Sequence, residues 1–461
     1  MLPTISIIGR PNVGKSTFFN ALTKTRDALV ADESGLTRDR KFGRGSVGDR
    51  DYWVIDTGGI GIDDDVIVSH ITQQALLAIE ESDAIFFVVD GRAGLTPVDE
   101  KLAQQIRKFN IPVYLVINKS EGIQAEIISA EFLGLGLETY TISAAHRSGI
   151  YELMEPVLAS FPDSEKIEID KDNRIKVAIL GRPNVGKSTL VNRILGYERV
   201  IAFDKPGTTR DSIFIPFERE GKSYTLIDTA GVRRRAKVHE TIEKFSVIKA
   251  LQAIESANVV VMLLDANEGM TDQDANLLGN VLDSGRALII AVNKWDDLDA
   301  SKREQVRYNL NRKLHFIDFA TTHFISALHG KGIQTLFKSI NSAWLAANKE
   351  TSTSKLNYIL EAAISKHEPP IVRGRRIKLR YIHQAGTNPP LFIIHGNQVS
   401  SLSGTYKRYL INVLREQLQL KGTPIHLSFK QGDNPFAGRK TSLTPRQRKK
   451  KVRLMKHVKK K

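Results

Sequence analysis

Two identical octets contain the residues of this chain that are best suited to chemistry. Each fits the pattern G-x-x-x-x-G-K-[ST], whose glycines let backbone N–H groups converge on phosphate oxygens while the next helix N-terminus adds partial positive charge. The copies are Gly9-Arg10-Pro11-Asn12-Val13-Gly14-Lys15-Ser16 and Gly181-Arg182-Pro183-Asn184-Val185-Gly186-Lys187-Ser188. They predict two phosphate sites, with the lysines at the β- and γ-phosphates of a nucleotide and the serines as ligands of Mg²⁺.

The surroundings of each octet are those that a phosphate loop requires. An apolar run that predicts a strand precedes each copy, at 5–8 and 177–180, and a stretch that predicts a helix follows, at 17–22 and 189–194. Ordinary glycine-rich turns are the alternative interpretation. Two identical octets, each between a strand and a helix, argue against it.

Further landmarks repeat at the same distance as the octets. Thr37 and Thr209 are 172 residues apart, and so are Asp56 and Asp228, the first residues of Asp56-Thr57-Gly58-Gly59 and Asp228-Thr229-Ala230-Gly231. We expect each threonine in a mobile loop that the γ-phosphate orders, and each aspartate near the metal at a strand end. The last glycine of each stretch admits a backbone N–H to the γ-phosphate. A repeat of this length indicates tandem domains.

A later pair of motifs predicts recognition of the base. Each follows an apolar strand run, and each is followed by a Ser-Ala pair: Asn118-Lys119-Ser120-Glu121 with Ser143-Ala144, and Asn293-Lys294-Trp295-Asp296 with Ser326-Ala327. A carboxylate three residues after the asparagine can accept hydrogen bonds from guanine N1 and its exocyclic amine, which adenine cannot donate. Any one Asp or Thr could be only a cap or turn residue. Five landmarks in the same order, twice, favour two guanine-nucleotide sites.

In combination, these motifs resemble the Era-like branch of the translation-factor-type GTPases. The tandem pair, followed by a small basic domain, closely resembles the double-GTPase family called Der or EngA over nearly the whole chain. The resemblance implies an α/β fold with two tandem P-loop GTPase domains (mostly parallel sheet, helices on both faces) and a small α+β KH-like domain. It also implies hydrolysis of GTP to GDP with magnesium, and a role in assembly of the large ribosomal subunit through nucleotide-dependent binding to ribosomal particles. Its catalytic residues would be Lys15, Thr37, Lys187 and Thr209.

Three features bear on the mechanism that the resemblance implies. Glu121 stands where the family pattern has Asp, so we expect weaker or geometrically adjusted nucleotide binding at the first site. Ile60 and Val232 stand where Ras-like enzymes carry a water-orienting glutamine, so we expect slow intrinsic turnover. Asn12 and Asn184 match the asparagine that relatives use to coordinate an activating potassium ion, which would neutralise charge between the β- and γ-phosphates. The alternative is that these asparagines only shape the loop.

The chain of 461 residues suits about three domains. We expect a first GTPase domain at 1–161, an acidic linker at 162–173, a second GTPase domain at 174–348, a KH-like domain at 349–437 and a disordered basic tail at 438–461. The pattern in the third domain predicts a helix at 355–366, strands at 377–383 and 391–395, a helix at 404–417 and a strand at 425–429. The KH signature Gly-x-x-Gly, which clamps nucleic-acid backbone, is not found between these elements.

Charge and composition indicate the partners. The net charge is +16, and residues 438–461 hold twelve Lys and Arg but no acidic residue, which leaves +4 for the rest. Such a block suits a polyanion, so we expect ribosomal RNA as partner, with a merely solubilising tail as the alternative. The chain has no Cys, its first strand begins near residue 4, and its apolar runs fall short of the ~20 residues that span a membrane. We therefore expect a cytoplasmic monomer with no membrane contact.

Two further basic clusters are candidate contacts with RNA or with an acidic protein surface. One is expected along a single strand, with alternate members on one face: Arg373, Arg375, Arg376, Lys378 and Arg380. The other, Arg233–Arg235, follows the second Asp-Thr-x-Gly motif, where the first domain has Asp63–Asp65 instead. A solvated, merely solubilising role is the alternative for both clusters.

Two other functions compete with a GTP-hydrolysing assembly factor. The chain could be an RNA-binding scaffold in which one nucleotide site is structural, and Glu121 is the best support for this interpretation. It could also be another Era-like enzyme, such as a tRNA-modification GTPase, but it lacks an added catalytic domain or a Cys.

Overall fold

The computed structural model describes residues 2–23, 31–32, 41–57, 73–161, 174–197, 199–200, 213–228, 247–372 and 375–431. The chain divides into two compact units. The first comprises Met1–Lys349, Thr387–Pro390 and Gln419–Ile425, and the second comprises Glu350–Gly386, Leu391–Leu418 and His426–Lys461. Among the described residues, no helix is long and apolar enough to cross a membrane.

The first of the two predicted GTPase domains is built on a seven-stranded sheet in the order β2-β3-β4-β1-β5-β6-β7. Strands β4, β1, β5, β6 and β7 run parallel, whereas β2, β3 and β4 pair antiparallel. The elements are β1 (Thr4–Ile8), α1 (Lys15–Leu22), β2 (Ala31–Asp32), β3 (Lys41–Val47), β4 (Arg50–Asp56), α2 (Gln73–Glu80), β5 (Ala84–Asp90), α3 (Pro97–Ile106), β6 (Val113–Asn118), α4 (Ala125–Ala130), β7 (Glu138–Thr141) and α5 (Ile150–Ala159).

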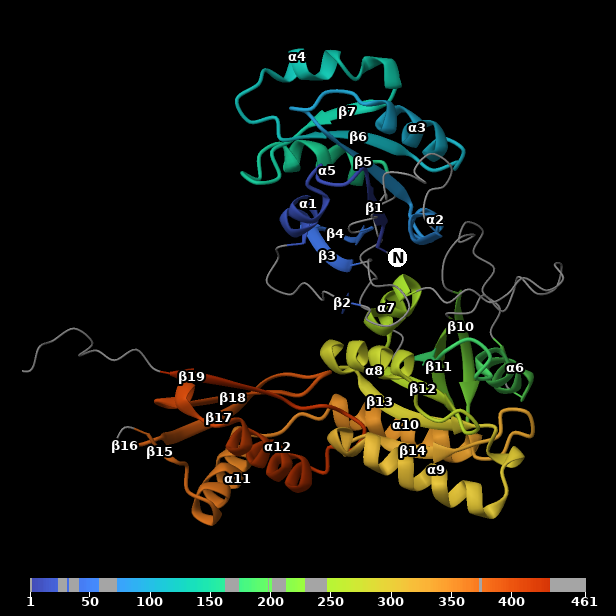
Figure 1. Ribbon diagram of the computed structural model, residues 1–461. Helices are drawn as coiled ribbons and strands as arrows, with labels where there is room; N and C mark the ends of the chain where they lie inside the picture. Colours follow the sequence, from blue (N-terminus) through green and yellow to red (C-terminus); the bar gives the residue numbers. More distant parts are fainter. Residues whose placement is uncertain are drawn as a thin grey trace, which may run out of the picture. The chain divides into compact units, whose positions relative to one another are not determined.

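Helices cover both faces of this sheet, as the continuous apolar runs of its central strands require (Figure 1). Residues of α1 and α5, including Phe18 and Leu153, pack on one face. Residues of α2, α3 and α4, including Ile79, Ile106 and Ile128, pack on the other. All seven residues of β5 are buried, so this strand lies in the middle of the layered core.

The second predicted GTPase domain has the same strand order, which read from the opposite edge of the sheet is β14-β13-β12-β8-β11-β10-β9. Helices α6 and α10 pack on one face of the sheet, and α7, α8 and α9 on the other. The elements are β8 (Ile175–Leu180), α6 (Lys187–Tyr197), β9 (Arg199–Val200), β10 (Ile213–Arg219), β11 (Lys222–Asp228), α7 (Val247–Ser256), β12 (Val259–Asp265), α8 (Asp272–Ser284), β13 (Ala287–Asn293), α9 (Ala300–Lys313), β14 (Thr321–Phe324) and α10 (Ile333–Ala347).

The second unit is a small α+β fold on a three-stranded sheet, β17-β18-β19, in which β18 pairs antiparallel with β17 and parallel with β19. Phe392, Ile393 and Ile394 of β18 are all buried, and α11 packs against β17 and α12. The elements are α11 (Thr353–Lys366), β15 (Ile371–Val372), β16 (Arg375–Arg376), β17 (Lys378–Gly386), β18 (Leu391–Asn397), α12 (Gly404–Leu418) and β19 (His426–Gln431).

The fold class predicted from the sequence is confirmed. In the third domain α11, β17, β18, α12 and β19 follow the predicted order, and the structure adds the short strands β15 and β16. One local expectation is wrong, because the basic cluster expected on a single strand has Arg375 and Arg376 on β16 but Lys378 and Arg380 on β17. Arg373 lies outside the described residues. A β-bulge also interrupts the pairing of β17 with β18 between Leu379 and Tyr381. Simple alternation therefore does not hold at Arg380.

Candidate nucleotide-binding sites

The lysine of each phosphate loop lies against the carbonyl oxygens of its own loop. Lys15 Nζ donates hydrogen bonds of 2.8 Å to both Gly9 O and Arg10 O, and Lys187 Nζ donates one of 2.7 Å to Arg182 O. Lys15 is buried at 5% exposure. Burial lowers the pKa of Lys15, and the nearby charge of Asp56 partly opposes that effect. The ammonium groups thus lie inside the loops, where a phosphate group can replace the carbonyl contacts.

The second glycine of each octet is required by both backbone conformation and space. Gly14 has φ +94°, and a Cβ there would lie 2.4 Å from Asn118 Nδ2. Gly186 has φ +97°, with the corresponding distance to Asn293 Nδ2 only 2.3 Å. No other residue fits this left-handed position without moving the asparagine behind it.

Asn118 and Asn293 connect two loops of their domains rather than pointing into open space. Asn118 Nδ2 donates to Val13 O at 2.8 Å, and Asn118 Oδ1 accepts from the Ala144 N–H at 3.0 Å. Asn293 repeats both bonds, to Val185 O and from Ala327 N, each at 2.8 Å. The phosphate loop, the Asn-Lys motif and the Ser-Ala loop therefore converge at the carboxyl ends of the strands.

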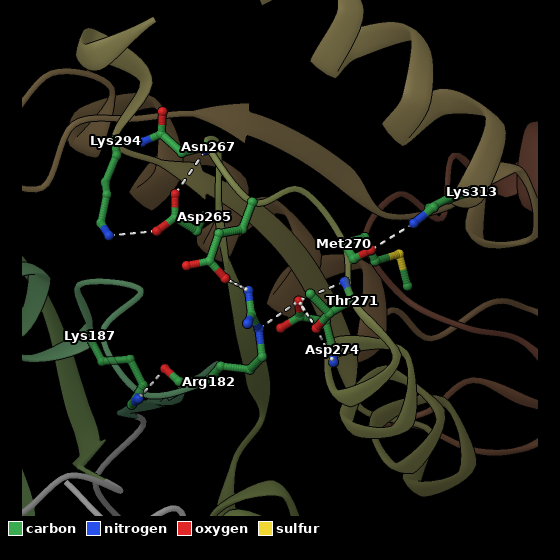
Figure 2. A network of polar contacts seen from close by, with 10 residues as sticks. Arg182, Lys187, Asp265, Asn267, Met270, Thr271, Asp274, Lys294 and Lys313 are labelled. Atoms are coloured by element: carbon green, nitrogen blue, oxygen red, sulfur yellow. Dashed lines mark hydrogen bonds and ion pairs between the residues drawn. The ribbon is translucent and has the colours of Figure 1, made fainter. Parts of the chain in front are cut away.

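Asp90 and Asp265 belong to these sites, although the sequence reasoning did not single them out. They end β5 and β12 and lie in register with the asparagines of the next strands. Lys119 Nζ lies 2.6 Å from Asp90 Oδ2, and Lys294 Nζ lies 2.5 Å from Asp265 Oδ2 (Figure 2). Their spacing of 175 residues equals that of the two asparagines, and this signal could have revealed them.

The ion pair between Asp90 and Lys119 lowers the pKa of the Asp90 carboxyl. Burial raises the pKa of the Asp90 carboxyl, but hydrogen bonds from Lys119 and from backbone N–H groups, together with the Lys119 charge, hold that pKa below its ordinary value. Lys119 Nζ also donates to Asn12 O at 2.9 Å. Lys119 has a left-handed backbone with φ 64°, which directs its side chain over the phosphate loop.

The arginines of the octets hold the loops against a helix. Arg10 Nε lies 3.4 Å from Asp99 at the start of α3, and Arg182 Nε lies 3.0 Å from Asp274 at the start of α8. Both aspartates are fully buried. Each forms a capping box with the threonine before its helix, and Figure 2 shows Thr271 and Arg182 meeting at Asp274. The arginine side chains thus anchor the loops, which leaves the loop backbone to contact phosphate.

The carboxylates predicted to recognise guanine are held differently in the two domains. Glu121 Oε2 accepts from Ser143 Oγ at 2.8 Å, and Glu121 Oε1 lies 2.8 Å from the guanidinium of Arg92. Asp296 accepts from Ser326. Its Oδ2 lies 3.3 Å from His329 Nε2. Its Oδ1 is buried and has no hydrogen-bond partner among the described residues. The hydroxyl contact lowers the pKa of each carboxyl, so both are charged at neutral pH.

The residues predicted to bind magnesium are described in part. Asp56 ends β4, is fully buried and pairs in register with Ile7 of β1, so it lies beside the strand that enters the phosphate loop. Thr57 Oγ1 donates to Ile7 O at 2.7 Å. Ser16 is exposed in the first turn of α1. A hydroxyl and a carboxylate are hard oxygen donors of the kind that Mg²⁺ binds, so these residues fit the ion.

Several predicted site residues lie outside the described residues. They are Thr37, Gly58, Gly59, Ile60, Thr209, Thr229, Ala230, Gly231 and Val232. The same holds for Arg233–Arg235, Asp63–Asp65, the linker at 162–173 and the tail at 438–461. Asp228 is described only as the last residue of β11.

Two sheets of the same order, each with a phosphate loop after its first parallel strand and an Asn-Lys-x-acid motif hydrogen-bonded to that loop, define a tandem P-loop GTPase. The family model described as 50S ribosome-binding GTPase matches residues 4–119 and 176–294. The model for the C-terminal KH-domain-like part of EngA bacterial GTPase enzymes matches residues 351–430.

Curated relatives match the chain from end to end. GTPase Der of Teredinibacter turnerae is 56% identical over 463 residues, covering all of both chains. GTPase Der of Hahella chejuensis is 52% identical, covering all of this chain and 98% of its own. GTPase Der of Escherichia coli O127:H6 is 51% identical over the full length of both. The chain belongs to the GTPase Der family and is a GTP-hydrolysing enzyme.

Proposed function

We propose that the chain binds and hydrolyses GTP at two sites and acts in maturation of the large ribosomal subunit, binding ribosomal particles in a nucleotide-dependent way. The observation that supports two working sites best is the repeated pair of hydrogen bonds from Asn118 and Asn293 to the phosphate loop and the Ser-Ala loop. A nucleotide site that had lost its function would not need to keep both hydrogen bonds. We assign the two sites to residues 1–161 and 174–348.

Different residues of each site would bind the phosphates, the base and Mg²⁺. Loop N–H groups and the N-terminus of α1 or α6 would bind the phosphates, and Lys15 and Lys187 would leave their loop carbonyls to contact them. Glu121 and Asp296 would accept hydrogen bonds from guanine. Ser16, Thr37 and Asp56 in the first site, and Ser188, Thr209 and Asp228 in the second, would hold Mg²⁺. The ion would supply positive charge to the oxygens of the leaving group.

Potassium activation remains part of the proposal through Asn12 and Asn184. Both have left-handed backbones, with φ 66° and 64°, a conformation that asparagine tolerates better than most residues. That conformation is itself a structural reason for asparagine, so the potassium role needs a functional test. GTP hydrolysis rates measured in potassium and in sodium at equal ionic strength decide whether these asparagines bind potassium or only shape the loop. Equal rates would remove the potassium role.

Ribosomal RNA is the proposed contact of the second unit. Strands β17, β18 and β19 contain no Asp or Glu, whereas Lys378, Arg380 and Lys430 are exposed. Tyr381, 42% exposed, stacks on His383 at 5.5 Å between ring centroids, and His383 stacks on the ring of His395 at 5.2 Å. Aromatic rings among positive charges suit unpaired bases and their phosphates. The twelve positive charges at 438–461 follow the last of these strands.

Co-sedimentation with purified ribosomal subunits tests this function. We expect the large subunit to bind the chain with a GTP analogue and to bind it less with GDP or without nucleotide. Deletion of 438–461 should weaken binding and reduce its dependence on salt, because phosphate contacts release counterions. Binding that is equal in all three nucleotide states would contradict the proposal. We also propose that the chain acts in the cytoplasm as a monomer.

An RNA-binding scaffold with one structural nucleotide site is the second candidate, favoured by the different surroundings of Glu121 and Asp296. Lys15→Ala and Lys187→Ala, measured separately, discriminate between the two functions. If each variant loses part of the total GTP hydrolysis, both sites turn over. If one variant keeps the full rate, the site that it alters is structural.

A further inference from the structure

The two guanine-recognition carboxylates differ in length and also in their charged neighbours. Arg92 lies two residues after Asp90, and the matching position in the second domain, two residues after Asp265, is Asn267. Backbone N–H groups of both residues donate to the preceding aspartate, at 3.0 and 2.9 Å, so the two positions are structurally equivalent. Among the described residues, a guanidinium contacts the carboxylate of the first domain and none contacts that of the second.

Arg92 and Ser143 together hold both oxygens of Glu121. The Arg92 guanidinium donates to Oε1 at 2.8 Å and the Ser143 hydroxyl donates to Oε2 at 2.8 Å. Ser143 Oγ is in turn 2.9 Å from His146 Nδ1. Each carboxylate oxygen retains a second acceptor site, because an ionised carboxylate offers about four lone-pair positions. Two donors from guanine can therefore bind beside the two protein donors.

A glutamate needs this support more than an aspartate does. Its additional methylene adds one rotatable bond, so an unheld Glu121 samples more orientations and loses more entropy when both oxygens align with a base. Asp296 lacks this bond; it accepts from Ser326, lies beside His329 and feels the charge of Lys331, but no guanidinium contacts it among the described residues. The longer carboxylate side chain and the guanidinium hydrogen-bonded to it thus occur in the same domain.

We propose that Arg92 is a positioning residue that orients Glu121 for two-point recognition of guanine, a role that the second site does not need. The inference rests on the proposed function, since it requires that the first site bind guanine nucleotides through Glu121. Arg92 is 58% exposed and Glu121 30% exposed at their side chains, so the pair is partly screened by solvent. Its effect is therefore modest in size and depends on salt.

The test measures binding of fluorescent GDP and IDP to the full chain carrying Lys187→Ala, which silences the second site. Inosine lacks the exocyclic amine, so IDP binding depends on one contact with Glu121, whereas GDP binding depends on two. We expect Arg92→Asn to weaken GDP binding about two- to fivefold at low salt, the range of an exposed ion pair, and to change IDP binding less. The loss should shrink at 0.5 M salt.

A double-mutant cycle makes the inference specific to the glutamate. In a Glu121→Asp background, Arg92→Asn should change GDP affinity by less than about 1.5-fold, because the shorter side chain needs no second donor. The reciprocal change Asn267→Arg, in a chain silenced by Lys15→Ala, should leave second-site affinity unaltered. Tighter GDP binding by Arg92→Asn, equal losses for GDP and IDP, or equal losses in both backgrounds would each overturn the inference. A parent chain that binds no GDP would overturn the proposed function itself.

Discussion

Removal of the Asn118 side chain tests the central connection of the first site. Asn118→Ala deletes the 2.8 Å bond to Val13 O and the 3.0 Å bond from Ala144 N, and the side chain that makes them is only 3% exposed. The loss of each bond leaves one buried backbone group without a partner, which costs about 1–3 kcal/mol per group. We therefore expect the connection between the phosphate loop and the Ser-Ala loop to weaken by about 2–6 kcal/mol in total.

Hydrogen exchange measured by mass spectrometry gives a local readout of this change. The Ala144 amide loses its acceptor directly, and about 2 kcal/mol of lost protection corresponds to roughly 30-fold faster exchange. Peptides that cover Ala327 supply an internal control, because Asn293 still holds that amide in the second domain. The reverse variant, Asn293→Ala, should speed exchange at Ala327 and leave Ala144 unchanged. Unaltered exchange at Ala144 in Asn118→Ala would refute the reasoning.

Three further predictions concern backbone, base and pH. Gly14→Ala should weaken first-site GTP binding roughly tenfold or more, because φ is +94° and a Cβ would lie 2.4 Å from Asn118 Nδ2; Gly48→Ala, at φ +60° with open space around it, is the control for backbone strain alone. Asp296→Asn should shift the second site from guanine to xanthine nucleotides in competition binding, and a retained guanine preference would contradict the base assignment. The folded-state pKa of Asp90 is lowered, so its ion pair stabilises the fold above the ordinary pKa of about 3.9 and this contribution disappears as pH falls through the lowered value. Calorimetry from pH 7 to 3 should show Asp90→Asn melting lower than the parent at neutral pH, with the gap closing below about pH 4; a gap that is constant over the whole range would exclude the ion pair as its source.

Much of the architecture could be read from local pattern. The octets, the apolar runs before them and the constant 172-residue offset predicted the strands, the helices after the loops and the duplication, and the structure bears these out. Local pattern suffices here because a phosphate loop is a contiguous segment whose glycines and helix start are adjacent in the chain. The basic cluster of the third domain was mispredicted for the converse reason. The strand break reflects the pairing of β16 with β15, and the bulge reflects the pairing of β17 with β18, neither of which a single segment reveals.

The sequence by itself determined which residues are candidates for contact with the phosphates and the base, because their types and order repeat in both domains. Only the tertiary structure decided what holds those residues. Asp90 supports Lys119 because parallel strands β5 and β6 end in register, and Arg92 reaches Glu121 across 29 positions of the chain. Such contacts join segments that are distant in sequence but adjacent in the sheet. Their specificity comes from strand register and side-chain geometry, which arise only when the sheet is assembled.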